Sequence, residues 1–405
     1  MRVCFISRRF FPAVSGMSVY AANLLRELVA LGHDVTMVSQ YRGDERGSRI
    51  YGGGPPPAAP GVDVIGLEAL GEQDGGDFER DVDVMVDTIV RLHSRAPFDI
   101  LHAQYGYPTG WATILAARRL GVPSVVSIQG GDGHWVGSCC ATHHTAMRAV
   151  IDHAGAVLIG GPSFVDEVAT RLDVSPARFT IVPGAVDTSV FHPGAPRQAQ
   201  APFHFLYHGR VDRRKGVLDF IEAAALMKAR GLVFSCTISG IGPDLEAARA
   251  LMAERSLQDV VACTGYAAYA EAPEFYRRAD AFASPTYAEG FSNTVLEAMA
   301  SRVPIVSCRV TGVVDCLRDD IALLTEPGDI AALAQAMTRL LEDAALRERL
   351  AGAALAECRA RYAWPVVARE ISSIYDRLRG TRPDADFEPH IPVTPCRFRA
   401  EPHLL

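Results

Sequence analysis

The sequence lacks any long apolar run, because no uninterrupted stretch approaches the ~20 residues that a membrane-spanning helix needs. It also lacks an excess of basic residues: 40 Lys and Arg stand against 47 Asp and Glu, and no basic stripe of the kind that binds nucleic acid is present. Residues 1–7 form too short an apolar run for a signal peptide. These shortages predict a protein that neither crosses a membrane nor binds nucleic acid.

Cysteines are few for a disulfide framework, with nine in 405 residues and no repeated spacing. Four lie in strand-like apolar runs, where a reduced cysteine behaves as a small hydrophobic residue. They are Cys4, Cys236, Cys263 and Cys308. The pattern predicts a reducing compartment, the cytoplasm, and leaves open a peripheral contact with the inner face of the membrane.

What the sequence does hold is an alternation of short apolar runs and longer helical patterns, typical of an α/β protein. The runs are apolar throughout rather than alternating, as in a parallel sheet covered on both faces. The predicted strands are 2–7, 34–39, 62–66, 99–103, 124–128, 156–159 and 179–182, then 203–208, 233–239, 260–264, 281–284, 304–307 and 321–324. The predicted helices include 17–31, 293–300 and 364–378.

A loop rich in Pro and Gly, residues 191–202, separates the two series of strands. We therefore predict two doubly wound domains, residues 1–198 and 203–363, with ligands bound beyond the carboxyl ends of the strands in a cleft between them. The run of Gly and Pro at 52–57 predicts a mobile loop over residues 41–60. The Pro-rich, patternless residues 381–405 predict a poorly ordered tail.

Two motifs carry the chemistry. Glu289 and Glu297 are eight residues apart across a turn from strand to helix, and a carboxylate can accept hydrogen bonds from a pair of sugar hydroxyls. The amides that begin the helix favour an anion such as a diphosphate. Arg210 and Lys215, in Gly-Arg-Val-Asp-Arg-Arg-Lys-Gly, follow the first strand of the second domain, where the two cations together could neutralise a diphosphate. No Walker loop and no Gly-x-Gly-x-x-Gly follows a strand, which argues against an NAD enzyme.

The order of Gly-Arg-x4-Lys-Gly at 209–216, Ser-Gly-Ile-Gly-Pro at 239–243 and Glu-x7-Glu at 289–297 resembles glycosyltransferase family 4 over about residues 1–380. The resemblance implies a GT-B fold, two facing Rossmann-like domains with a helix at 364–380 that crosses back to the first. It implies retaining transfer of a sugar from a UDP or GDP sugar, with no metal and no other cofactor. The acceptor stays open among saccharides, lipid-linked sugars and small molecules, and the oligomeric state is not indicated.

The resemblance also assigns roles to residues. Arg210 and Lys215 would bind the donor diphosphate and stabilise its charge as it leaves. Glu289 would hold the hydroxyls of the transferred sugar, and Glu297 those of the ribose. The remaining donor-side residues would bring backbone or side chain close to the phosphates and sugar; they are Gly16, Gly209, Gly240, Gly290, Phe291, Ser292 and Asn293. For Gly16, in the loop after the first strand, the alternative is that its backbone lets the acceptor approach.

The first domain departs from the family pattern. Gln129 stands where many relatives have a histidine that touches the donor sugar, whereas Asp132 matches. His102 is present, but Gln104 replaces a second histidine. We predict His102, Gln129, Asp132 and His134 on the acceptor or sugar side.

The stretch 134–144 holds two adjacent cysteines and three histidines. Its spacing matches no common zinc pattern, so the sequence favours no metal there. Buried thiols, or a wall of the acceptor site in which His134 or His143 acts as a base, are the alternatives. Arg8 and Arg9 follow the first strand, where they could contact an anionic acceptor or a membrane surface, or simply hold a loop.

Two other classes share this fold: a sugar-nucleotide epimerase, and a transferase that has lost catalysis and acts as a scaffold. An epimerase would need its own acid and base. Loss of catalysis would most simply remove Lys215 or Glu289, and both are present. The sequence therefore favours an active transferase.

Overall fold

The structure, a computed structural model, describes residues 1–13, 15–45, 53–194, 202–265 and 269–400. Contacts divide the chain into unit 1, Met1–Pro183 with Trp364–Leu405, and unit 2, Gly184–Ala363. The division at Pro183 falls before the end of the first domain expected at residue 198. The reason is that residues after Pro183 pack within unit 2, where the Val186 amide donates to the Tyr362 carbonyl and Phe191 lies edge-on to Tyr276.

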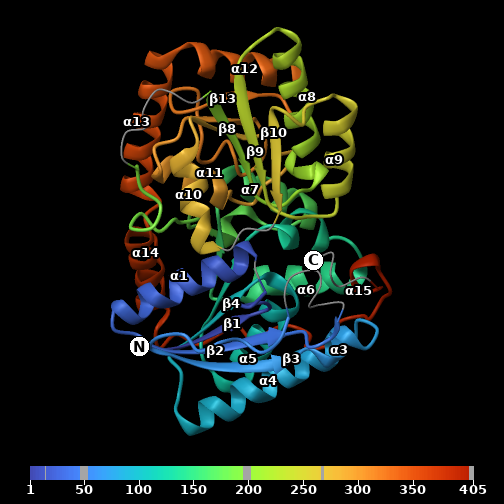
Figure 1. Ribbon diagram of the computed structural model, residues 1–405. Coiled ribbons are helices and arrows are strands. Elements are labelled where there is room, and N and C mark those ends of the chain that lie inside the picture. The colour runs from blue at the N-terminus through green and yellow to red at the C-terminus, as the bar shows by residue number, and fades with distance from the viewer. Residues whose placement is uncertain (14, 46–52, 195–201, 266–268, 401–405) are drawn as a thin grey trace. The chain divides into compact units, whose positions relative to one another are not determined.

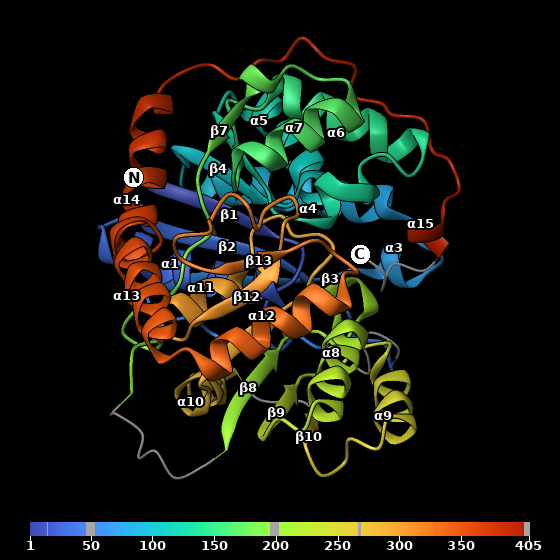
Figure 2. The ribbon, with the colours of Figure 1, turned by 90° about the horizontal axis from the view of Figure 1, so that it is seen from above.

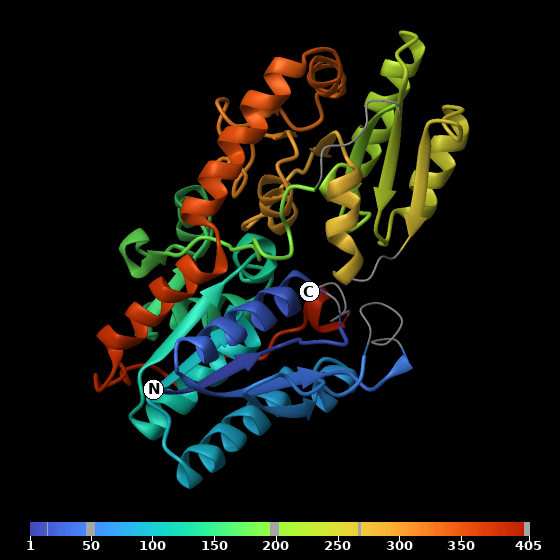
Figure 3. The same cartoon turned by 60° about the vertical axis from the view of Figure 1, so that its left-hand side comes forward.

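Unit 1, as far as it is described, is a seven-stranded sheet in the order β3-β2-β1-β4-β5-β6-β7. Every pairing between these strands is parallel. Figure 3 shows α1 on one face of this sheet and α4 on the other. The strands are β1 (Arg2–Ser7), β2 (Asp34–Tyr41), β3 (Val62–Glu68), β4 (Ile100–Gln104), β5 (Ser124–Ile128), β6 (Ala156–Ile159) and β7 (Phe179–Ile181). The helices are α1 (Gly16–Ala30), α3 (Leu70–Gln73), α4 (Phe78–Arg95), α5 (Trp111–Leu120), α6 (Ala141–His153), α7 (Pro162–Leu172), α14 (Trp364–Leu378) and α15 (Arg397–Ala400).

The described part of unit 2 is a six-stranded parallel sheet in the order β10-β9-β8-β11-β12-β13 (Figure 1). The strands are β8 (Phe203–His208), β9 (Phe234–Ser239), β10 (Val261–Gly265), β11 (Ala281–Ser284), β12 (Ile305–Cys308) and β13 (Leu323–Thr325). The helices are α8 (Val217–Ala229), α9 (Leu245–Glu254), α10 (Ala272–Arg278), α11 (Asn293–Ala300), α12 (Ile330–Glu342) and α13 (Ala344–Arg361).

Successive residues of a strand point to opposite faces, and this builds two cores in unit 2. Phe205 and Tyr207 of β8 pack with side chains of α8, α9 and α12, whereas Leu206 packs with those of α10, α11 and α13. Both faces are therefore apolar. This explains why the strands read as continuous apolar runs in the sequence.

The C-terminal segment, residues 381–400, is ordered, so the sequence prediction of a poorly ordered tail is wrong for these residues. Residues 381–400 lack periodicity, yet they pack along unit 1 (Figure 2, red). Phe387 lies edge-on to Trp111 of α5, and Arg399 pairs with Glu79 of α4. The segment is held by separate aromatic and ionic contacts with unit 1 rather than by regular secondary structure, so no periodic pattern marks it.

The expected mobile loop at 41–60 lies partly outside the described residues, which resume at Gly53. Within the described residues, no helix combines the length and apolarity required to cross a membrane.

Candidate active site

The predicted donor residues of unit 2 lie at the point where its strand order reverses. Arg210 and Lys215 follow β8, and Glu289 follows β11; these two strands are neighbours although β9 and β10 separate them in sequence. Open α/β sheets bind ligands beyond the carboxyl ends of the strands at such a reversal, where the two connecting chains diverge to opposite faces. The fold thus brings the two sequence motifs to one place.

Lys215 and Glu289 meet directly. The Lys215 Nζ atom lies 2.9 Å from Glu289 Oε1 and also donates to the carbonyl oxygen of Ala288 at 3.1 Å. The Lys215 side chain is about one-third exposed and that of Glu289 is 14% exposed. A cation and a carboxylate therefore stand side by side, and the cation is the more exposed of the two.

Backbone contacts fix the loop that carries Lys215 against the loop that carries Glu289. The amide of Tyr287 donates to the carbonyl of Arg214 at 2.9 Å. Gly216 has φ +73°, and a Cβ there would lie 1.8 Å from the carbonyl oxygen of Pro285. Only glycine allows both this left-handed backbone and this approach. The main chain therefore holds the loops that carry Lys215 and Glu289 against each other.

Gly209 and Gly240, at the ends of β8 and β9, also meet. A Cβ on Gly240, whose φ is +145°, would lie 1.8 Å from the Gly209 carbonyl oxygen. The absence of a side chain at Gly240 lets the ends of β8 and β9 approach each other closely beside Arg210. Arg210 Nε lies 3.5 Å from Asp212, which also receives a bidentate contact from Arg214.

The helix that carries Glu297 begins at the predicted phosphate position. Ser292 is the N-cap of α11, Asn293 is its first residue, and Gly290 before them is buried. The Phe291 ring packs on Gly184, where a Cβ would lie 2.6 Å from the ring, and stands edge-on to Tyr362. Phe291 is therefore partly buried against the core of unit 2, and the amides at the start of α11 are the groups of this helix able to bind an anion.

Glu297 is buried, and its Oε2 accepts a hydrogen bond of 2.8 Å from the Tyr276 hydroxyl. Burial raises the pKa of Glu297 to about 8, although the bond from Tyr276 partly opposes this rise. The carboxyl group is thus largely protonated at pH 7 in this state. Tyr276 lies on α10, and sequence reasoning missed it because no local pattern links it to the motif.

In unit 1, two of the predicted residues are buried and make hydrogen bonds within the protein interior. His102 is fully buried with Nδ1 bonded to the Tyr375 hydroxyl and Nε2 to Ser127, and burial lowers its pKa to about 3. Asp132 is buried and accepts backbone hydrogen bonds from Gly106 and Gly130. Both hold neighbouring segments together.

Of the other predicted residues of unit 1, Gln129 and His134 lie in the connection between β5 and α6, and Gly16 begins α1. Gln129 is half-buried and accepts from the Gln104 side chain at 2.7 Å. Gly16 is exposed at the start of α1. His134 is buried, 2.9 Å from Glu167, and its ring stacks on Trp135. Of these, Gln129 and Gly16 reach solvent.

The arginines after β1 form a buried ionic cluster. Arg8, Arg9 and Arg42 all lie within 3.3 Å of the carboxylate of Glu72, which is 3% exposed. Burial opposes the ionisation of Glu72, but the three guanidinium groups outweigh it and hold its pKa below the ordinary value. Arg42 also pairs with Asp44 at 2.7 Å. The arrangement favours the interpretation that the arginines hold loops in place.

Known proteins match this chain along most of its length. Residues 15–185 match the family described as glycosyl transferase 4-like domain, and residues 193–356 match glycosyl transferases group 1. The chain is a GT-B glycosyltransferase of the family-4 type. This confirms the fold and the reaction class predicted from the sequence: the enzyme transfers a sugar from a nucleotide sugar.

Two kinds of curated relative share about a quarter of its residues. Glycogen synthase of Mycobacterium tuberculosis is 25% identical, over 97% of this chain and 98% of its own. D-inositol 3-phosphate glycosyltransferase of Frankia alni is 26% identical, over 89% and 94%. The two names indicate different acceptors, so the family shows the reaction of this enzyme and not its acceptor.

Solved structures share the fold. Sucrose-phosphate synthase of Thermosynechococcus elongatus superposes with a TM-score of 0.75 at 21% identity, over 93% of this chain and 98% of its own. The Anabaena protein HepE, solved with UDP and glucose, superposes with a TM-score of 0.70 at 16% identity. The match covers 93% of this chain and 99% of HepE.

Proposed function

We propose that unit 2 binds a UDP or GDP sugar beyond the carboxyl ends of β8 and β11, and that this glycosyltransferase transfers the sugar with retention and without a metal ion. The observation that carries the proposal is the contact of Lys215 with Glu289 at the strand-order reversal. The presence of UDP in the HepE structure agrees with such a donor.

Departure of the nucleoside diphosphate develops negative charge on the phosphate and positive charge on the sugar. Lys215 and Arg210 would stabilise the leaving diphosphate, because fixed cations act most strongly where charge increases in the transition state. The donor phosphate would replace Glu289 as the partner of Lys215. The freed carboxylate of Glu289 could then accept hydrogen bonds from the sugar hydroxyls.

Cations of the protein would thus do the work that a divalent ion does in other transferases, with no separate cofactor. Glu297 would accept hydrogen bonds from the two ribose hydroxyls. The amides at the start of α11 would bind a phosphate oxygen. The acceptor would bind unit 1, with Gln129 and Gly16 as its solvent-accessible candidates. The described cysteines are all unpaired, which supports a reducing, cytoplasmic setting.

The donor is tested by thermal stabilisation of the purified enzyme against uridine, guanosine and adenosine diphosphates and their sugars, with neither added metal nor chelator. We expect selective stabilisation by the uridine or guanosine series, of about 2.7 kcal/mol at a hundredfold excess over Kd. No response to any nucleotide, or an equal response to all, would contradict the proposal. The anomeric configuration of the product and an unchanged rate with added Mg²⁺ test retention and metal independence.

Glu289→Ala should abolish release of the nucleoside diphosphate from the donor while the melting temperature changes little, because Lys215 remains partly solvated. The control is Glu246→Ala, which removes a carboxylate that is 84% exposed elsewhere in unit 2. Wild-type turnover in Glu289→Ala would show that the sugar is held by other residues.

A further inference from the structure

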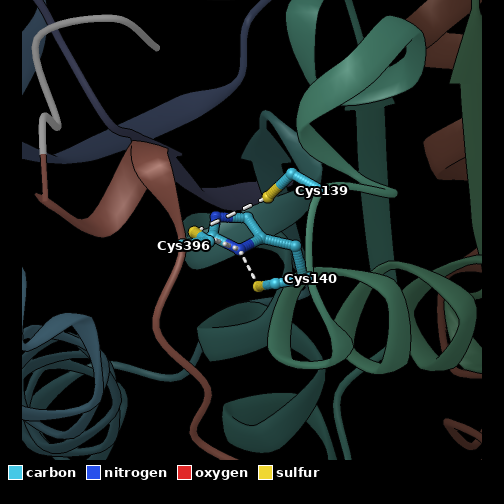
Figure 4. Close-up of side chains that lie close together, drawn as sticks. Cys139, Cys140 and Cys396 are labelled. Atoms are coloured by element: carbon cyan, nitrogen blue, oxygen red, sulfur yellow. Dashed lines mark hydrogen bonds between the residues drawn. The ribbon is translucent and has the colours of Figure 1, made fainter.

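Four side chains with metal-binding atoms converge in unit 1, outside the proposed donor site. Cys139 and Cys140 precede α6, His143 lies in its first turn, and Cys396 comes from the C-terminal segment just before α15. Their ligand atoms all lie within 4.8 Å of one another. Figure 4 shows the sulfur atoms of Cys139, Cys140 and Cys396 close together around an imidazole ring.

Three of the six separations between the ligand atoms are close to the edges of a coordination tetrahedron. Zinc bonds of ~2.3 Å to sulfur and ~2.0 Å to nitrogen place two sulfur ligands about 3.8 Å apart, and sulfur and nitrogen about 3.5 Å apart. The Cys139 and Cys396 sulfur atoms are 3.7 Å apart. His143 Nδ1 lies 3.8 Å from the sulfur of Cys396 and 3.1 Å from that of Cys140. These three distances need to change by a few tenths of an ångström at most.

Contacts on both sides of the cluster position Cys396 without help from the thiols. Thr394 donates its amide to the Thr142 hydroxyl at 2.8 Å, and the Thr142 amide donates back to the Thr394 hydroxyl at 3.2 Å. Beyond the cysteine, Arg399 pairs through both terminal nitrogens with Glu79. The fourth ligand is therefore held in place by the fold itself.

We propose that Cys139, Cys140, His143 and Cys396 bind one zinc ion. Three thiolates and an imidazole form a Cys₃His set, typical of structural zinc sites, and the softness of thiolates disfavours magnesium and calcium. Four protein ligands leave no open position for a substrate. The ion would be structural, tying the C-terminal segment to the start of α6, and the proposal does not depend on the function proposed for unit 2.

Adjacent cysteines fit no common zinc spacing when residues 134–144 are considered alone. The structure removes His134 from the set, because this residue pairs with Glu167, and supplies Cys396 from more than 250 residues along the chain.

The test is the metal content of the untagged enzyme, purified without chelator from zinc-supplemented cells. We expect one zinc per chain in the wild type and in Cys263→Ser, whose half-buried cysteine lies on β10. We expect at least a tenfold lower content in Cys396→Ser and in Cys140→Ser. The proposal would be overturned if Cys396→Ser kept the full zinc content. It would also be overturned if the wild type contained no zinc and bound none when zinc was added.

A second measurement does not depend on the folding of variants. Cobalt(II) in place of zinc should give thiolate-to-cobalt charge transfer and the intense visible bands of a tetrahedral site in the wild type. Thiol titration of the metal-free, denatured enzyme should find all nine thiols. A weak octahedral spectrum, or seven thiols from a Cys139–Cys396 disulfide, would overturn the assignment.

Discussion

At the residue scale, the protonation and exposure of each residue proposed to bind the sugar donor depend on its surroundings more than on its residue type. Glu289 is near solvent and paired with Lys215, whereas Glu297 is buried beside Tyr276. Two glutamates of one motif therefore have different environments. Burial raises the pKa of Glu297 to about 8.

This difference predicts that nucleotide binding releases protons near pH 7. Two ribose hydroxyls that donate to Glu297 would favour its charged form and lower its pKa, so the proton held in the free enzyme should leave. Calorimetry of nucleotide binding in buffers of different ionisation enthalpy measures the release. Glu297→Gln should remove it, and an unchanged release in that variant would exclude Glu297 as its source.

The same pKa predicts how stability depends on pH. The folded pKa of Glu297 is above the ordinary value of 4.5, so its stabilising contribution is complete below pH 4.5 and is lost as the pH rises through about 8. Chemical denaturation between pH 5 and pH 9 should therefore show the wild type losing stability relative to Glu297→Gln. A constant difference between the two across this range would show that Glu297 does not titrate there.

At the element scale, the site depends on main-chain contacts between the loops that follow β8 and β11. Gly216 is the point of closest approach, since a Cβ there would overlap the Pro285 carbonyl oxygen. A helix-opening glycine is visible in the sequence. Its contact with Pro285, 69 residues farther along the chain, is decided by the pairing of β8 with β11.

We expect Gly216→Ala to lower both stability and nucleotide affinity, by about 2 kcal/mol or more in stability, because φ strain and a steric overlap combine. Gly231→Ala is a matched control: φ is +75° at that position, and nothing lies within 4 Å of its added Cβ. Denaturant unfolding and nucleotide titration of both variants measure the difference. Equal nucleotide affinity in the two would show that the loop contact does not shape the site.

At the scale of the whole molecule, the C-terminal segment belongs to unit 1, and its contacts should stabilise that unit alone. Arg399→Ala removes a bidentate pair with Glu79 and a guanidinium 5.5 Å from the Phe78 ring. We expect a loss of about 2 kcal/mol and faster amide hydrogen exchange in residues 381–400 and at the start of α6, with exchange in unit 2 unchanged.

The control for this prediction is Arg397→Ala, which changes an exposed arginine of the same short helix. Equal exchange in Arg399→Ala and Arg397→Ala would show that the ion pair with Glu79 does not hold the segment.

The sequence by itself determined the strands, the fold class and the motifs at 209–216 and 289–297, because apolar runs and glycine-bounded turns are local signals. β1, β5, β8 and β11 have the predicted bounds, and so do α11 and α14. Tertiary structure alone decided that Lys215 meets Glu289, that His102 lies in the interior, and that Cys396 joins Cys139. The physical reason is that strand order and the path of an aperiodic segment depend on contacts between residues far apart in the chain, which leave no periodic pattern in the sequence.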